Sequence, residues 1–213
     1  MIMSLTLAAR SLAAQTDVTC VPVADRAQRT SGCFITAREE LGTLSTALPI
    51  YWHIDTYNTL EAATAARQSG GTVVRSLDRI WLFTIAPQAW RPRDGRRMAT
   101  IGPLPIVAAS RHAAVYLEGI FQPGMMSGVH RHPGVEAWLT LEGAMCLETP
   151  EGRLDQKAGD SGVLVRDGVP MVLTGTGTGP RKSLVLILQD ADLPRSLPAH
   201  DWTPMGLCAA EPK

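Results

Sequence analysis

Two histidines and one glutamate stand close together near the middle of the chain, in a spacing suited to a metal ion. His130 and His132 are two residues apart, so on a β-strand both imidazoles leave the same face. Glu136 follows four residues later, past a Pro133–Gly134 corner that can turn the chain onto a neighbouring strand. Two imidazoles and one carboxylate form a facial triad for a divalent first-row metal with open coordination positions. The sequence therefore predicts a metal site at His130, His132 and Glu136.

Glycines frame the segment that carries these three residues. Gly124 lies six residues before His130, and Gly143 lies seven residues after Glu136; both are natural turn points. Glycine, five residues, His-x-His, three residues, glutamate, six residues and glycine is the first motif of the cupin superfamily, which this chain resembles at every fixed position. The resemblance implies a cupin-like double-stranded β-barrel, or jelly roll, with the metal inside.

A second cupin motif should follow about one strand pair later, and residues 159–171 resemble it in part. Counting back from Gly168, the usual proline is Arg166, and Gly159 lies one residue too far upstream. The usual third histidine, the last protein ligand of the metal, is Met171. A thioether is a weak ligand for hard cations. The resemblance therefore leaves two readings open, a roomier site with three protein ligands or a degenerate site.

The resemblance covers about residues 100 to 190 and is specific for fold rather than activity, because cupins include dioxygenases, isomerases, decarboxylases, storage proteins and sugar-binding modules. We expect a metal-dependent oxygenase or isomerase acting on a small polar organic substrate. The alternative is a non-catalytic cupin that binds a small ligand or serves as a structural domain. Fe, Mn, Zn and Ni as divalent ions all suit the ligand set. The sequence contains no nucleotide motif, nucleophile elbow or phosphate loop.

Side chains on neighbouring strands are candidates for the cavity wall. The candidates are Tyr116, Glu118, Gln122, Trp138, Thr140 and Met171. Trp138 and Thr140 share strand parity with Glu136, and three others share one face of the strand expected over residues 113–122. Glu118, or a metal-bound water, is the candidate for proton transfer. Register decides which face of each strand lines the cavity, so the opposite faces are the alternative.

Short strands at regular spacing with glycine and proline turns predict a mainly β protein with a mixed α/β N-terminal extension. The alanine-rich run 59–67, N-capped by Asn58, predicts a short helix. We expect four regions, namely a tail or signal remnant over 1–31, the extension over 32–107, the cupin barrel over 108–192 and a proline-rich C-terminal tail over 193–213.

Composition limits the partners. The 20 basic and 20 acidic residues give a net charge of zero, which provides no field for nucleic acid or an anionic membrane. No apolar run reaches the length of a membrane span. We expect a small-molecule ligand and neither nucleic acid nor membrane as partner. Added strands in the extension would also permit a homodimer.

Four cysteines and the start of the chain bear on location. Three pairings are possible in principle, and we expect Cys20–Cys33 and Cys146–Cys208. A poorly anchored terminal segment gains the most stability from a disulfide. The chain starts with an apolar run, and Ser11–Leu12–Ala13 has the small-x-small form of a signal-peptidase site. We therefore expect a periplasmic or extracellular protein; four reduced cysteines in the cytoplasm are the alternative.

Overall fold

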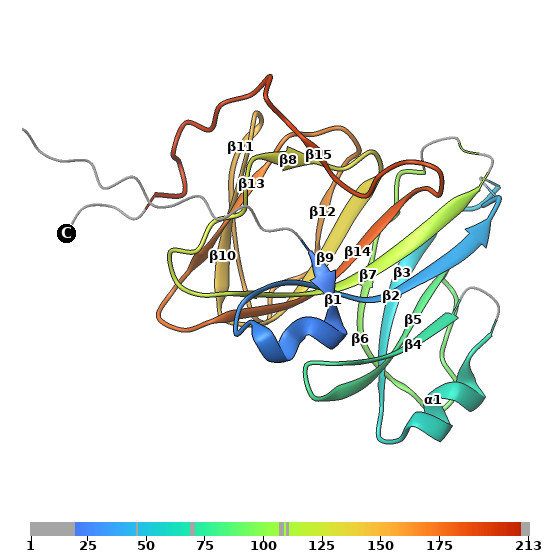
Figure 1. The fold of residues 1–213 in the computed structure, drawn as a ribbon. Helices are drawn as coiled ribbons and strands as arrows, with labels where there is room; N and C mark the ends of the chain where they lie inside the picture. The colour runs from blue at the N-terminus through green and yellow to red at the C-terminus, as the bar shows by residue number, and fades with distance from the viewer. Residues whose placement is uncertain (1–19, 46, 69–70, 107–108, 110, 210–213) are drawn as a thin grey trace, which may run out of the picture.

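Three layers of β-sheet make up the protein, and the central layer is shared by two cores (Figure 1). The computed structural model describes residues 20–45, 47–68, 71–106, 109 and 111–209. The central sheet has the strand order β1-β2-β7-β14-β9-β12, and only its β1–β2 pair is parallel. Its strands are β1 (Val21–Pro22), β2 (Gly32–Gly42), β7 (His112–Phe121), β14 (Arg181–Asp190), β9 (Val135–Glu142) and β12 (Val163–Val165).

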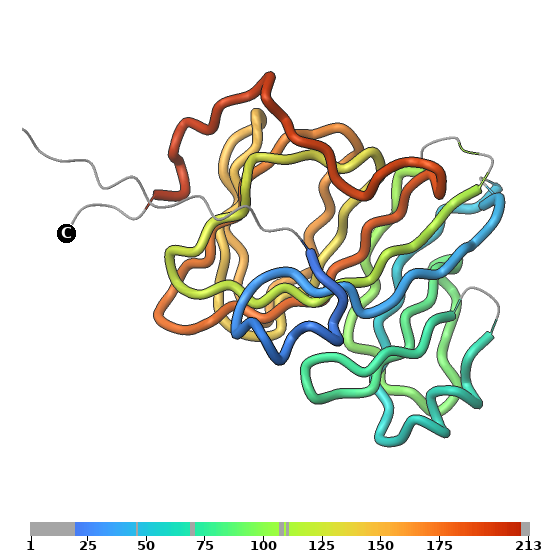
Figure 2. Tube along the Cα trace, in the orientation of Figure 1, coloured from blue at the N-terminus to red at the C-terminus, as the bar shows by residue number. Residues whose placement is uncertain are grey.

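Two smaller sheets face one side of the central sheet (Figures 1 and 2). One has the order β11-β10-β13, and the other pairs β15 with β8. Their strands are β8 (His130–Arg131), β10 (Ala144–Thr149), β11 (Gly152–Lys157), β13 (Val172–Thr176) and β15 (Leu197–Pro198). Together with the central sheet they form the expected mainly β, cupin-like double-stranded fold, as separate sheets rather than one closed barrel.

The N-terminal extension forms the third layer, on the other side of the central sheet (Figure 1). Its four-stranded sheet has the order β4-β5-β3-β6, and α1 (Leu60–Ala66) packs beside it. The strands are β3 (Ile50–Tyr57), β4 (Gly71–Ser76), β5 (Arg79–Pro87) and β6 (Arg96–Ile101). The 3-10 helix η1 (Val23–Gln28) joins β1 to β2, and β2, the first strand of the extension, belongs to the central sheet. The expected boundary between residues 107 and 108 falls outside the described residues, as does Ser11–Leu12–Ala13.

The helix begins one residue later than the sequence indicated. Thr59, rather than Asn58, is its N-cap, and the Thr59 Oγ1 atom accepts a hydrogen bond of 3.1 Å from the backbone N–H of Ala62. The backbone of Thr59 is extended, with φ of −134° and ψ of 155°, so this residue belongs to the cap and not to the first turn. Both residue types cap well, and the backbone conformation decides between them.

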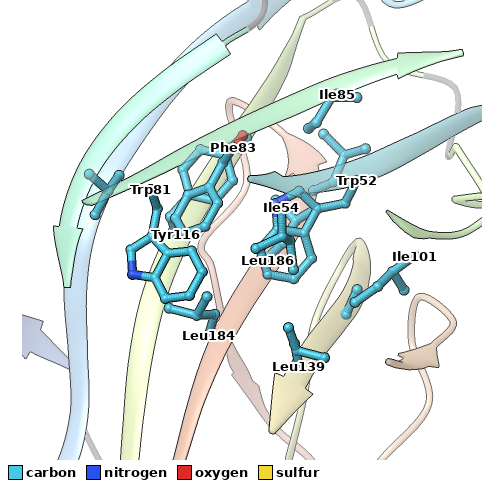
Figure 3. Close-up of a cluster of buried hydrophobic side chains, with 14 of the residues drawn as sticks. Trp52, Ile54, Trp81, Phe83, Ile85, Ile101, Tyr116, Leu139, Leu184 and Leu186 are labelled. Carbon is cyan, nitrogen blue, oxygen red and sulfur yellow. The ribbon is translucent and has the colours of Figure 1, made fainter. Parts of the chain in front are cut away.

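Apolar side chains fill the space between the central sheet and the N-terminal sheet (Figure 3). Leu184 and Leu186 of β14 point into this core, while Val185 and Ile187 point into the other core. A strand buried on both faces reads as a continuous apolar run, and this explains the uninterrupted sequence of β14. Aromatic rings complete the packing: Phe83 lies 4.9 Å, centroid to centroid, from Tyr116. The extension is therefore packed against the cupin-like part by its own hydrophobic core.

Two disulfides fix the ends of the described chain, in the pairing that we expected. Cys20–Cys33 ties the first described residue to β2, and Cys146–Cys208 ties the C-terminal segment to β10. In the described part of the chain, no helix has the length and apolar character that a membrane crossing needs.

The core between the central and N-terminal sheets should dominate stability. Leu186 is fully buried in it, so Leu186→Ala should lower the free energy of unfolding by about 2–5 kcal/mol. Leu154 on β11 is 41% exposed, and the matched change Leu154→Ala should cost less than about 0.5 kcal/mol. Urea unfolding followed by tryptophan fluorescence measures both, and equal costs would contradict this packing.

Candidate metal centre

The three predicted ligands converge. His130 belongs to β8, His132 follows this strand directly, and Glu136 lies on β9. One potential ligand atom from each lies within 4.8 Å of the other two, and His132 Nε2 is 3.6 Å from Glu136 Oε2. Gly134 makes the turn between them possible, because a Cβ there would lie 2.2 Å from the carbonyl oxygen of Leu188. Only glycine lets the chain pass β14 so closely and return onto β9.

Backbone carbonyls orient both imidazoles. His130 Nδ1 lies 2.8 Å from the carbonyl oxygen of Gly128, and His132 Nδ1 lies 2.6 Å from that of Arg195. A carbonyl oxygen only accepts, so in both rings the proton resides on Nδ1 and the lone pair on Nε2. This arrangement of a ligand histidine held by a carbonyl is typical of metal sites.

The charge state of the three side chains also suits a metal. Burial lowers the pKa of His132 from its ordinary 6.5 to about 4. Burial, and then the neighbouring His132, lower the pKa of His130. Burial raises the pKa of Glu136, while His130 and Arg181 oppose this rise. The Oε2 atom of Glu136 is buried without a hydrogen-bond partner, which is costly for a carboxylate. A cation between the three donors would stabilise it.

The three side chains lie in the wall of a cavity of about 530 Å³ between the central sheet and the smaller sheets. Most of the wall is apolar, formed by Leu117, Phe121, Trp138, Leu173, Val185 and Ile187. The Cys20–Cys33 disulfide lines one side. Ser127, Arg181 and Arg195 add polar groups. A cavity of this volume matches the size of sites for small organic molecules.

The C-terminal segment covers part of this cavity. Residues 194–198 line it, and Leu197 of β15 pairs with Arg131 of β8. Further along, the Glu148 carboxylate accepts hydrogen bonds from the backbone N–H groups of Gly206 (3.0 Å) and Leu207 (2.8 Å). The described part of the proline-rich tail is therefore held by its neighbours and contributes the carbonyl of Arg195 to the site. No sequence pattern indicated this role.

Two of the predicted cavity residues, Tyr116 and Glu118, face the opposite side of the central sheet. The residues of β7 that line the cavity are Leu117, Gly119 and Phe121, so the even-numbered positions must point toward the N-terminal sheet. Glu118 is fully buried there, where Arg26 Nη1 lies 2.9 Å from Oε1 and Ser76 Oγ donates to Oε2 at 2.6 Å. Glu118 therefore does not reach the metal ligands and has no proton-transfer role at this site.

The other predicted cavity residues lie at different places, and not all of them line the cavity. Trp138 lines the cavity, and Thr140 lies behind it; both donate hydrogen bonds to Oε1 of Gln156, at 2.9 and 2.6 Å. Gln122 is exposed beyond the end of β7. Met171 is buried directly opposite His130, since the two residues exchange backbone hydrogen bonds of 3.1 and 2.8 Å.

Arg181 is a cavity residue that the sequence interpretation missed. It is the first residue of β14 and shares strand parity with Val185 and Ile187, which also line the cavity. Burial lowers its pKa to about 10, with Glu136 opposing the change, so the guanidinium stays charged at neutral pH. The parity of Arg181 with alternate residues of an apolar strand was a usable signal once the buried face was known.

Comparisons with known proteins give a fold-level likeness. No model of a protein family matches the sequence, and no curated protein matches it. Among solved structures, a cupin superfamily protein from Desulfitobacterium hafniense aligns at 19% identity over 36% of this chain and 68% of its own, with a TM-score of 0.33. A cupin domain from Bordetella pertussis aligns at 22% identity over 36% of this chain and 81% of its own, with a TM-score of 0.32.

A DMSP lyase from Ruegeria pomeroyi aligns at 20% identity over 41% of this chain, with a TM-score of 0.37. This chain covers 43% of that lyase, less than half of its length. Two features of this chain therefore support its resemblance to the cupin superfamily. They are the complete first motif around His130 and the facing β-sheets that carry this motif.

Proposed function

We propose that this protein binds one divalent first-row metal ion through His130, His132 and Glu136 and acts as an oxygenase on a small organic molecule. The observation that supports the proposal best is the orientation of the two imidazoles, whose Nδ1 atoms are both engaged by backbone carbonyls. Their Nε2 atoms and the unpartnered Oε2 of Glu136 are then the free donors of the group. When bound, such an ion supplies open coordination positions and Lewis acidity for the substrate and for dioxygen.

The protein residues would hold the substrate beside those positions and exclude water. Met171 stands opposite His130, where the usual third histidine of cupins is missing, so the site has three protein ligands and a neighbouring thioether too weak to bind these ions. The apolar wall around Trp138 favours the carbon skeleton of a substrate. The segment 194–198 covers the cavity and limits exchange with solvent.

Oxygenase chemistry fits this lining better than isomerase chemistry. Of the described residues that line the cavity, Glu136 is the only acid, and His130 and His132 are the only imidazoles. All three are assigned to the metal. An isomerase that moves a proton with a side-chain base would need a further group, and Glu118 lies on the other face of the sheet.

A non-catalytic cupin that binds a small molecule is the second candidate. Met171 favours it, because a buried methionine in place of a ligand histidine weakens metal binding. We also infer an oxidising compartment, the periplasm or the extracellular space, for either function. The two disulfides support this inference, since cytosolic thiols are kept reduced.

Metal analysis tests the proposed function. After incubation with Fe(II), Mn(II), Zn(II) or Ni(II) and removal of excess metal, elemental analysis should find about one ion per chain for at least one of the four metals. His130→Ala should retain less than about a tenth of that amount, since even indirect ligand partners are worth tenfold or more. His200→Ala, a change at an exposed histidine, is the matched control and should retain all of it. Wild-type protein without stoichiometric metal would refute the proposal.

Restoring the missing histidine should strengthen the site. Met171 and His130 are directly opposed in an antiparallel bridge, so their side chains leave the same face. Met171→His should therefore raise Zn(II) affinity by about tenfold or more, while Met171→Leu should leave it unchanged. Competition with a zinc chelator measures both. Equal affinities in the two variants would show that position 171 does not reach the metal.

Acidification should destabilise the metal-free protein through His132. Its folded-state pKa of about 4 lies below the ordinary 6.5, so between these values the unfolded chain binds more protons and stability falls as pH falls. The loss of folding free energy from protonation of His132 totals about 3 kcal/mol, and it is absent in His132→Asn. Urea unfolding at pH 7 and pH 4 should give a smaller acid loss in the variant. Glu136, whose pKa is raised, changes stability with pH in the opposite direction. The wild-type protein is therefore compared with His132→Asn, since both contain Glu136. Identical pH profiles would contradict a neutral buried His132.

A further inference from the structure

Arg181 is a buried cation with two guanidinium nitrogens, Nε and Nη2, that make no hydrogen bond to the described residues. Its side chain lines the cavity, and the whole residue is 2% exposed. The guanidinium carbon lies 5.9 Å from the ring centroid of Phe121 and 5.9 Å from that of Trp138. Two aromatic rings therefore stabilise the cation by cation–π contact.

Cation–π contacts leave the N–H groups of Arg181 unpaired. Guanidinium N–H bonds lie in the plane of the group, whereas the faces of the rings meet the charge. The Nε and Nη2 atoms are buried and have no hydrogen-bond partner among the described residues. Buried arginines are rare unless paired, because an unsatisfied charged donor is costly. A bound anionic molecule would supply the hydrogen-bond acceptors that these two nitrogens lack.

A second unpaired polar group lies beside these donors. Ser183 lies two residues after Arg181 on β14, and its Oγ atom is also buried without a partner. Gly119 of β7 is directly opposite Ser183, and a Cβ on Gly119 would lie 2.9 Å from Ser183 Oγ and 3.7 Å from Arg181 Nη1. The backbone of Gly119 is not among those with positive φ, so space rather than conformation explains the glycine. Gly119 therefore makes room for the buried hydroxyl group of Ser183, next to the guanidinium of Arg181 that lines the cavity.

The charge balance of the cavity favours an anion. Among the described lining residues, Glu136 is the only acid, and it faces Arg181, Arg195 and the proposed metal ion. A divalent ion bound to Glu136 would neutralise this carboxylate and leave both arginines without a counter-charge. An anionic ligand would restore the balance, and a carboxylate matches the planar fork of an arginine.

We infer that Arg181 forms a carboxylate-binding subsite beside the metal centre, and that the ligand of this cavity is a small organic acid with an apolar body. The inference rests on the proposed function in taking this cavity as the substrate site and in counting the metal ion in its charge balance. The carboxylate is held by Arg181, and the apolar body packs against Leu117, Leu173 and Ile187. Arg181 thereby orients the acid relative to His130, His132 and Glu136.

Calorimetric titration with benzoate and its neutral analogue benzamide tests the subsite. The full-length wild-type protein should bind benzoate at least about thirtyfold more tightly than benzamide, because truncating one side of a buried charge pair typically costs that much or more. Arg181→Met should remove this preference. The matched control Arg166→Met, at an exposed arginine paired with Glu151, should keep it. Equal affinities of wild-type protein for the two compounds, or no binding of benzoate, would overturn the inference.

A second variant covers misfolding of Arg181→Met. Gly119→Ala keeps the charge but adds a Cβ to the cavity wall, 2.9 Å from Ser183 Oγ and 3.7 Å from Arg181 Nη1. It should weaken benzoate binding about tenfold while circular dichroism shows the native fold. Undiminished benzoate binding in this variant would overturn the placement of the carboxylate at Arg181. Titrations run with and without Zn(II) separate the proposed metal site from the proposed carboxylate subsite. Benzoate preference in metal-free protein that is lost in Arg181→Met supports the subsite even if no metal binds, and stoichiometric zinc without any preference refutes the subsite alone.

Discussion

The central sheet is buried on both faces, and this constraint governs the rest of the molecule. Each of its strands contributes alternate side chains to two interiors, one apolar core against the N-terminal sheet and one cavity-bearing core against the smaller sheets. The parity of a residue along its strand therefore decides whether its side chain packs in the apolar core or faces the cavity. Leu186 and Arg181 share β14, yet one belongs to each interior. The N-terminal extension is thus part of what holds the metal-ligand strands in place, because it covers the back of the sheet that carries Glu136.

Both interiors of the central sheet contain buried polar side chains. Glu118, on the packed side, is neutralised by Arg26 and Ser76. On the cavity side, Glu136 and Arg181 retain buried atoms without partners. Such atoms are costly in a folded protein and are concentrated at sites that bind something. Trp52 Nε1 and Tyr116 Oη on the packed face also lack partners, but Glu136 and Arg181 line the cavity, where a cation and an anion would complete their interactions.

Local patterns predicted that the side chains of His130, His132 and Glu136 lie together, because the three residues are close in sequence and one turn at Gly134 joins the segments that carry them. The apolar run of β14 and both disulfide pairings were also predictable. The assignment of Tyr116 and Glu118 to the cavity was wrong, since alternation gives two faces but not which core each meets. Arg195 was missed because its contribution is a backbone carbonyl, delivered by a segment 63 residues beyond His132. Arg181 was missed because its burial depends on Phe121 and Trp138, which come from other strands.

The central claim is that two imidazoles and one carboxylate bind a single metal ion inside this fold. X-ray absorption spectroscopy at the zinc edge of the Zn(II)-loaded protein tests it most directly. The account predicts a first shell of nitrogen and oxygen atoms at about 2.0–2.2 Å, with the multiple-scattering signal of two imidazoles and no sulfur at about 2.3 Å. A shell with fewer than two imidazoles, or one containing sulfur from Met171, would contradict the account.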